Sequence, residues 1–293
     1  MDGVLNINKP IGLTSHDVVE RIRAAAHQKE VGHTGTLDPM ADGVLVVCLG
    51  RATRLVPYLQ QLSKKYRGII QFGIRTTTQD IEGEVFCQIP APHLTEDQVR
   101  AAAQHFIGRI EQIPPMYSAI KIEGKRLYEL AREGKEVERK PRTVTIYTLQ
   151  IEAFEPGEFP TARFYLECSA GTYVRTLASD IGDRLGIGAH LKQLTRVAVG
   201  HFELEQAQPL DDLTDPETIA AHLMAPADAL PHLPRWKPTA AYLERLLNGN
   251  FVQVEHPLWT PGGYVLVMED EQRIALVARW LPPLLRPVRV IRA

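Results

Sequence analysis

Cysteine is scarce in this chain of 293 residues. Its three cysteines, Cys48, Cys87 and Cys168, are odd in number and widely spaced, and no two of them form a C-x-x-C pair. This spacing argues against a disulfide framework and against a zinc knuckle built on paired cysteines. It is typical of proteins that work in a reducing compartment.

Long hydrophobic runs are also absent. The longest uninterrupted apolar stretch covers residues 44–49, far short of the roughly 18–20 residues that a membrane-spanning helix needs. The first residues have neither the basic start nor the apolar segment of a signal peptide. We therefore expect a soluble, cytoplasmic protein with no membrane partner.

The motifs that bind common cofactors are missing as well. Residues 186–191 (G-I-G-A-H-L) lack the third glycine of a dinucleotide-binding loop, and residues 124–126 (G-K-R) lack the Ser or Thr of a P-loop. His27, Glu30 and His33 are spaced by three, but a glycine lies between them at an expected helix end, which does not favour metal binding. We expect no metal and no cofactor, so the chemistry must come from the protein's own side chains.

The net charge of −2 comes from an uneven distribution of charged residues. Residues 203–228 hold seven acidic residues and no Lys or Arg, so the rest of the chain has 33 basic against 28 acidic residues, a net +5. A basic face on a nearly neutral protein is compatible with an RNA partner. Scattered, solvated charge is the alternative, and the totals alone do not decide between the two.

Strand patterns alternate with helical patterns through the first two-thirds of the chain. Residues 4–8 alternate at period two, and Ser15 or Asp17 can cap the helix that follows. Thr95 begins a capping box for a second helix. Further strands are expected at 43–50, 66–73, 144–154 and 163–169, and a further helix at 173–185. Because the order is not strictly β-α-β, we expect an α+β fold around a mixed sheet.

The composition changes near residue 230. Prolines are frequent between residues 226 and 238, which is typical of a linker. Beyond the linker, the sequence shows one helical pattern and several strand patterns, at 242–248, 251–254, 264–268, 274–278 and 288–291. We therefore expect a first domain at 1–230 and a small, mostly-β domain at 235–293.

The segment at residues 31–43 carries an unusual combination of residues. It places one His and one Asp among glycines and a proline, directly before an apolar strand. An ordinary turn, in which Asp38 accepts nearby backbone N–H groups, explains this pattern from the residues alone. Residues 108–145, however, hold nine Lys or Arg against six Glu, interleaved with tyrosines. This basic stretch interleaved with aromatic residues raises a functional alternative to the ordinary turn.

Seven short motifs follow one another after a Lys9-Pro10 turn. In order they read G-H-T-G-T-L-D-P (32–39), K-Y-R (65–67), R-T-T-T-Q-D-I-E-G-E (75–84), P-P-M-Y-S-A-I-K (114–121), G-K-R-L-Y-E-L-A-R-E-G (124–134), G-T-Y-V-R-T-L (171–177) and G-A-H-L (188–191). In this order the chain resembles the TruB family of bacterial tRNA pseudouridine-55 synthases over about two-thirds of its length. Asp42 departs from the family, in which a small or hydroxyl residue is common at that position.

The resemblance implies a pseudouridine synthase fold, with a mainly antiparallel central sheet flanked by helices. It also implies isomerisation of uridine 55 in the T-arm loop of tRNA. The base is flipped out of the RNA, detached from its ribose and rejoined through C5, which requires no redox change. By this resemblance Asp38 is the nucleophile, and Arg175 keeps it ionised. Tyr66 stacks on the base and helps to remove the C5 proton.

The same resemblance implies residues that bind the RNA. His33 occupies or stacks against the space that the flipped base leaves. Tyr173 and Leu194 form apolar walls around the uracil, and Lys121 and Arg126 belong to a basic, RNA-contacting insertion. The C-terminal domain resembles PUA-type RNA-binding modules, although a purely stabilising β-domain is the alternative.

The RNA-contacting insertion covers about residues 112–142. With it we expect tRNA as the partner, action without a guide RNA because the chain lacks long basic extensions, and a monomer because no exposed apolar helix is apparent. A non-catalytic tRNA-binding or folding factor is the main alternative. Such a factor shares the basic and aromatic residues but does not need Asp38, Tyr66 and Arg175.

Overall fold

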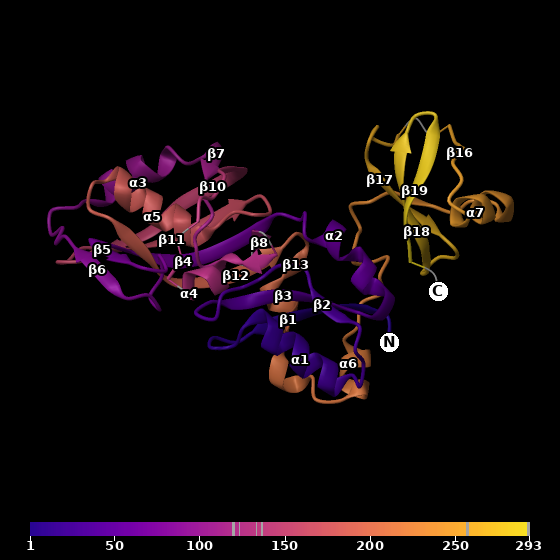
Figure 1. Ribbon diagram of the computed structural model, residues 1–293, viewed down its shortest axis with the longest axis horizontal. Helices are drawn as coiled ribbons and strands as arrows, with labels where there is room; N and C mark the ends of the chain where they lie inside the picture. Colours follow the sequence, from indigo (N-terminus) through magenta and orange to yellow (C-terminus); the bar gives the residue numbers. More distant parts are fainter. Residues whose placement is uncertain (119–120, 123, 133, 136, 256–257, 292–293) are drawn as a thin grey trace.

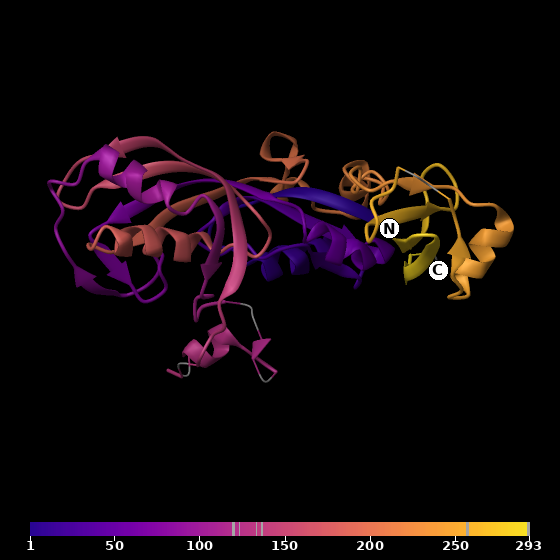
Figure 2. The same ribbon diagram turned by 90° about the horizontal axis from the view of Figure 1, so that it is seen from above.

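The computed structural model describes residues 1–118, 121–122, 124–132, 134–135, 137–255 and 258–291. The molecule is elongated, with a large sheet at one end and a smaller sheet near the C-terminus at the other (Figure 1). The N-terminus lies near the junction of the two sheets (Figures 1 and 2).

The large sheet has ten strands within the described residues, eight of them in the order β14-β1-β3-β12-β4-β11-β10-β7. Neighbouring strands are antiparallel except for β1 with β14 and β3 with β12. The strands are β1 (Gly3–Lys9), β2 (Val31–His33), β3 (Asp42–Leu49), β4 (Lys64–Phe72), β7 (Gly108–Gln112), β10 (Arg142–Glu155), β11 (Thr161–Cys168), β12 (Ala189–Val199), β13 (Phe202–Glu203) and β14 (Gln208–Pro209). The predicted mixed, mainly antiparallel sheet is confirmed.

Strand β3 is buried on both faces, as its apolar sequence predicts. Val44 and Val46 belong to one hydrophobic cluster, while Leu45 and Val47 belong to another, together with helix α1 (Ser15–Ala25). The strand that follows the Asp38 loop is therefore fixed from two sides. This gives the loop a rigid base.

Helix α1 is capped by Thr14, so the prediction of Ser15 or Asp17 as its cap was wrong. The Thr14 hydroxyl accepts the Asp17 N–H at 3.1 Å, and the Asp17 carboxylate accepts the Thr14 N–H at 2.8 Å, which completes a capping box. Ser15 points inward instead, and its hydroxyl accepts the Leu37 N–H at 2.8 Å. Neighbouring hydroxyl residues compete for a cap, and here the burial of Ser15 decides the outcome.

Helices α3 (Glu96–Gln104) and α5 (Val174–Arg184) share one hydrophobic cluster with strands β4, β10, β11 and β12. Thr95 caps α3 with Gln98 in the predicted capping box. Helix α5 begins directly after the loop that follows β11. Its first turn therefore lies over the middle of the large sheet.

The smaller sheet has the order β15-β17-β18-β19-β16 in the part of the chain that the structure describes. Its elements are β15 (Arg235–Trp236), helix α7 (Ala240–Leu247), β16 (Val252–Gln253), β17 (Tyr264–Met268), β18 (Ile274–Leu281) and β19 (Leu284–Val290). Leu266 and Val277 of this sheet share a buried cluster with Val199, Phe202 and Leu230. The predicted mostly-β C-terminal domain is confirmed, and it packs against the rest of the molecule.

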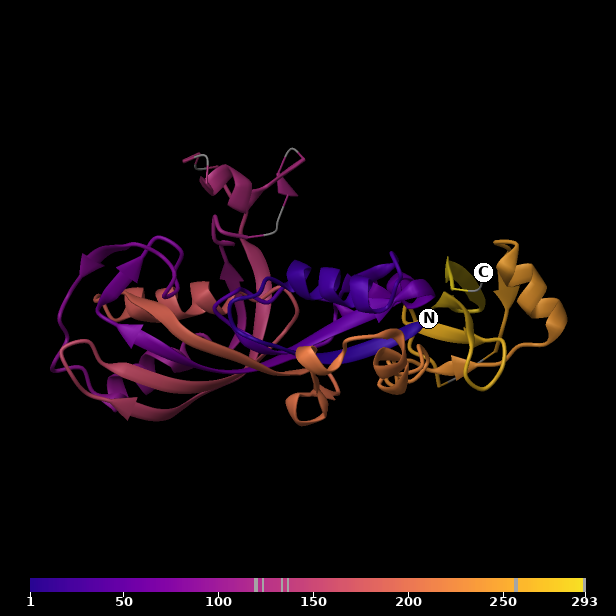
Figure 3. The same ribbon diagram turned by 90° about the horizontal axis from the view of Figure 1, so that it is seen from below.

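Two small hairpins lie outside both sheets. One consists of β5 (Ile74–Thr76) and β6 (Val85–Gln88). The other consists of β8 (Lys121–Ile122) and β9 (Lys125–Arg126), and it leads into helix α4 (Leu127–Arg132). Figures 2 and 3 show β8, β9 and α4 projecting away from the sheets.

The remaining short elements are η1 (Gly50–Leu55), α2 (Val56–Leu59), η2 (Leu204–Gln206), η3 (Leu210–Asp212) and α6 (Pro216–Ala221). Among the described residues, no helix combines the length and the apolar character needed to cross a membrane.

Candidate active site

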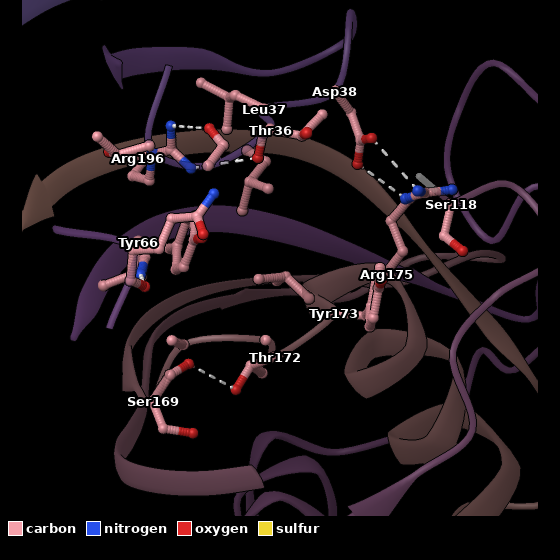
Figure 4. A pocket seen from close by; sticks show the side chains of 18 of the residues that line it. Thr36, Leu37, Asp38, Tyr66, Ser118, Ser169, Thr172, Tyr173, Arg175 and Arg196 are labelled. Atoms are coloured by element: carbon pink, nitrogen blue, oxygen red, sulfur yellow. Dashed lines mark hydrogen bonds and ion pairs between the residues drawn. The ribbon is translucent and has the colours of Figure 1, made fainter. Parts of the chain in front are cut away.

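A cleft of about 570 Å³ opens where the Asp38 loop, the start of α5 and the middle of the large sheet meet (Figure 4). Its size is within the range of pockets that enclose whole small molecules. It is lined by residues 34–38, 57, 60, 61, 64, 66, 118, 169–175, 194 and 196. Segments far apart in the sequence thus converge on one site.

The loop that carries Asp38 is held on two sides by side chains. From α1, the Ser15 hydroxyl accepts the Leu37 N–H and donates to the Leu37 carbonyl. From β12, the buried Arg196 donates to the carbonyls of Gly35 and Thr36 at 3.2 and 3.3 Å. Figure 4 shows Arg196 beside the loop. Because the backbone is fixed on both sides, the Asp38 carboxylate is held in one place.

Asp38 forms a two-point ion pair with Arg175. The Arg175 Nε lies 2.9 Å from Asp38 Oδ2, and Nη2 donates to Oδ1 at 3.3 Å. The Asp38 side chain is 32% exposed, whereas that of Arg175 is only 6% exposed. A guanidinium in this position stabilises the negative charge of a carboxylate inside a cleft. The acid therefore faces the cavity while its partner forms the wall.

The other donors of Arg175 are also used, which fixes the guanidinium. Nη1 donates to the Thr78 carbonyl at 3.0 Å, and Nη2 donates to the Tyr117 carbonyl at 2.8 Å. Nη1 also lies 3.5 Å from Oδ2 of Asp80, a carboxylate that is almost fully buried. Burial raises the pKa of Asp80. One arginine therefore joins two carboxylates and two backbone segments.

Tyr66 lies on β4 opposite Arg196, with which it is in register. Its side chain is buried and forms part of the cleft wall. Burial raises the pKa of Tyr66 to about 12, so its phenol is protonated at neutral pH. This direction is opposite to what a general base needs.

Five of the eight residues predicted for the site line the same cleft: Asp38, Tyr66, Tyr173, Arg175 and Leu194. Four of these residues stand in three separate motifs, at 32–39, 65–67 and 171–177, and Leu194 follows the motif at 188–191. The fold brings all five together.

The other three predicted residues do not line this cleft as the structure describes it. His33 ends β2, upstream of the Asp38 loop, and its Nδ1 accepts the Gly35 N–H at 3.3 Å. Lys121 and Arg126 contribute backbone to the β8–β9 hairpin, and their side chains lie outside the described part of the structure. Within the described residues, no group of three or more His, Cys, Asp or Glu could hold a metal ion.

Sequence reasoning missed four residues that build the site: Lys64, Asp80, Gln112 and Arg196. Asp80 stands within the motif at 75–84, and Lys64 directly precedes the motif at 65–67. These two motifs could therefore have indicated both residues. Gln112 and Arg196 act through hydrogen bonds to backbone carbonyl and N–H groups of distant segments, and no sequence pattern indicates such contacts.

Comparison with known proteins identifies the family. Residues 23–174 match the family model of the TruB family pseudouridylate synthase N-terminal domain, and residues 175–247 match that of the tRNA pseudouridylate synthase B C-terminal domain. The chain belongs to the TruB family. It is therefore a pseudouridine synthase, an isomerase, as the motifs predicted.

Relatives from two bacteria show how far the similarity extends. The tRNA pseudouridine synthase B of Symbiobacterium thermophilum is 52% identical over 249 residues, which covers 85% of this chain and 82% of the relative. The protein of the same name from Geobacillus thermodenitrificans is 42% identical, and the match covers all of both chains.

A solved structure agrees with the fold. The crystal structure of a Cbf5-Nop10-Gar1 complex contains a chain that is 26% identical, with a TM-score of 0.76. The match covers 99% of this chain and 85% of that one. The predicted pseudouridine synthase fold is thus confirmed over nearly the whole molecule.

Proposed function

We propose that this TruB-family enzyme converts uridine 55 in the T-arm loop of tRNA to pseudouridine. The observation that carries the proposal is the Asp38–Arg175 ion pair, which presents one carboxylate to the cleft. The tRNA substrate is supported by the names of the relatives that are 42–52% identical to this chain. The motifs quoted above support the position of the target in the T-arm loop.

The reaction requires the N1–C1′ bond to break and a C5–C1′ bond to form. The proton on C5 leaves, and N1 gains one, so no oxidant or reductant takes part. We assign the nucleophilic role to Asp38, because a carboxylate can attack and leave again. Its attack at C6, its attack at C1′ and its assistance of elimination at the ribose are all compatible with a carboxylate that faces the cleft.

Around the extruded base, we assign the walls of the cleft to Tyr66, Tyr173 and Leu194, which all line it. The raised pKa of Tyr66 favours stacking against the uracil over removal of the C5 proton by a phenolate. A base inside a folded loop must be flipped out to reach this cleft. We assign His33 to the RNA segment that the base leaves.

We further propose that the enzyme acts alone in the cytoplasm, as a monomer and without a guide RNA. The projecting hairpin and α4 are the part of the molecule that we assign to the tRNA arm, with Lys121 and Arg126 as phosphate or base contacts (Figure 2). The C-terminal domain, at 235–293, is proposed to contact the acceptor-stem side of the tRNA.

Incubation of the purified protein with unmodified tRNA, followed by nucleoside analysis, tests this function. We expect pseudouridine at position 55 with the wild type alone. Asp38→Asn removes the charge but keeps the shape, and it should abolish the product while tRNA binding stays within about tenfold, ~1.4 kcal/mol. Product from Asp38→Asn would contradict the nucleophilic role. Tight binding without any product from the wild type would instead favour a non-catalytic tRNA-binding factor.

A further inference from the structure

The cleft extends well beyond the Asp38–Arg175 pair. In Figure 4, Ser169 and Thr172 lie at the opposite end of the cleft from Asp38, with Tyr66 on one wall between the two ends. The lining there also includes Gln60, which follows α2, and Lys64 at the start of β4. A single uracil ring held against Asp38 has no need for this polar second half.

Lys64 is the charged group of this second half. Its side chain is buried, and Nζ donates to the carbonyls of Gln60 and Leu62, both at 2.6 Å. An ammonium has three donors, and within the described residues the third has no hydrogen-bond acceptor. Burial lowers the pKa of Lys64 to about 8. At neutral pH, Lys64 is therefore still protonated in most molecules.

Arg196 adds a second buried cation to the same cleft. Its guanidinium donates to the carbonyls of Gly35, Thr36 and Val44. Neither Arg196 nor Lys64 has a carboxylate within ion-pair distance among the described residues, whereas the buried Arg175 has two. Buried charges without a counter-ion are costly. Arg196 lies on the wall beside the Asp38 loop, and Lys64, which has an unused donor within the described residues, lies nearer the other end. Two such cations lining one cleft favour the entry of an anion next to Lys64.

We propose that the Lys64 half of the cleft is a phosphate subsite that binds the RNA backbone next to the flipped uridine. The third hydrogen of Nζ donates to a phosphate oxygen, and Arg196 strengthens the positive field behind it. The inference rests on the proposed function, because that function brings a nucleotide of an RNA chain into this cleft. It adds a residue that positions the substrate backbone while Asp38 acts on the base.

Capping of the carbonyls that follow α2 is the competing role for Lys64. A cap contributes to stability and is independent of the RNA. A phosphate contact contributes to RNA recognition, depends on the salt concentration, and is lost when one particular phosphate is changed. The experiment therefore measures kcat/KM and its salt dependence beside the melting temperature.

The substrate is a T-arm stem-loop RNA, either unmodified in its backbone or carrying one uncharged methylphosphonate on the 5′ or the 3′ side of the target uridine. For Lys64→Gln we expect kcat/KM to fall roughly tenfold, as for the loss of one charge-assisted hydrogen bond. The slope of log(kcat/KM) against log[salt] should become shallower by about 0.7–1. Lys64→Arg should recover most of the loss.

The methylphosphonate substrates provide the decisive comparison. One of the two should lower kcat/KM roughly tenfold with the wild type and less than about twofold with Lys64→Gln, because the contact is already gone. Lys65→Gln is the matched control. It removes the same charge from the neighbouring residue, which points to the other face of β4, and it should keep the full methylphosphonate penalty.

Equal methylphosphonate penalties in the wild type and Lys64→Gln would overturn the phosphate subsite. So would a Lys64→Gln protein that has a lower melting temperature but an unchanged salt slope, which identifies a cap only. If the wild type forms no pseudouridine, the proposed function fails. In that case, the Kd values of the wild type and Lys64→Gln for the unmodified and methylphosphonate stem-loops test the subsite separately.

Discussion

Gln112 and Tyr173 exchange two hydrogen bonds that join the end of β7 to the start of α5. The Gln112 amide oxygen accepts the Tyr173 N–H at 3.0 Å, and the amide nitrogen donates to the Tyr173 carbonyl at 3.3 Å. Gln112 is almost completely buried. Since Arg175 lies two residues after Tyr173, this contact helps to set where the guanidinium meets Asp38.

Substitution of Gln112 by Ala should therefore affect both stability and catalysis. It leaves the Tyr173 N–H without its partner, whereas the Tyr173 carbonyl keeps the Leu177 N–H at 3.0 Å. We expect a loss of about 1–3 kcal/mol in the free energy of unfolding. The rate constant kcat should fall as well, because Arg175 is less well positioned. Urea denaturation and single-turnover assays measure the two effects. Gln150→Ala, an exposed position on the neighbouring strand β10, should change neither, and equal effects at both positions would contradict the assigned role.

Local sequence patterns predicted most of the elements of this fold. Alternation and apolar runs identified β3 and β4, and a capping box identified α3, because each pattern depends only on neighbouring residues. The motifs also predicted that Asp38 and Arg175 belong to one site, although 137 positions separate them.

The contacts that hold the site together could not be predicted in the same way. The hydrogen bonds of Arg196 depend on the parallel register that sets it opposite Gly43, and those of Gln112 depend on how β7 and α5 pack. Such contacts follow from tertiary structure, and a polar side chain gives no local sign of its distant backbone partner. The choice of Thr14 over Ser15 as a helix cap depends on burial for the same reason.

Asp80 offers a test of how the Arg175 guanidinium is positioned. Asp80→Asn keeps the size of the side chain but removes the buried negative charge that lies 3.5 Å from Nη1. We expect kcat at saturating tRNA to fall at least about tenfold, a cost of ~1.4 kcal/mol in the barrier, with tRNA binding almost unchanged. The control is Asp183→Asn, which disrupts a more exposed ion pair with Arg75 and should leave activity near that of the wild type. A fully active Asp80→Asn protein would show that Asp38 and the backbone carbonyls position Arg175 without help.

Gly43 is required by the close approach of β12 to β3. Its φ is +101°, and a Cβ atom there would lie 2.3 Å from the backbone carbonyl oxygen of Arg196. Gly43→Ala should therefore destabilise the protein by at least ~2 kcal/mol, from backbone strain and steric overlap together. Gly32→Ala is the matched control, because a Cβ atom at Gly32 meets nothing within 4 Å. Thermal melting of both variants checks the prediction, and similar melting temperatures would contradict it.

Lys9 predicts a pH dependence of stability. The side chain is fully buried, and Nζ donates to the carbonyls of Pro10 and Leu13 at 2.9 and 2.7 Å. Burial lowers the pKa of Lys9 from 10.5 to about 8. Between these two pH values the unfolded chain binds more protons than the folded protein, so this lysine makes the free energy of unfolding rise with increasing pH.

Urea denaturation of the wild type and of Lys9→Met, at steps between pH 8 and 10.5, measures this contribution. The difference between the two proteins isolates Lys9, because buried groups present in both cancel. One of these groups is Cys48. Burial raises the pKa of its thiol to about 12, so Cys48 makes the free energy of unfolding fall as the pH rises. The wild type should gain stability relative to Lys9→Met as the pH rises. Lys29→Met, at an exposed position, should follow the wild-type profile. Parallel profiles for the wild type and Lys9→Met would show that Lys9 releases no proton on folding.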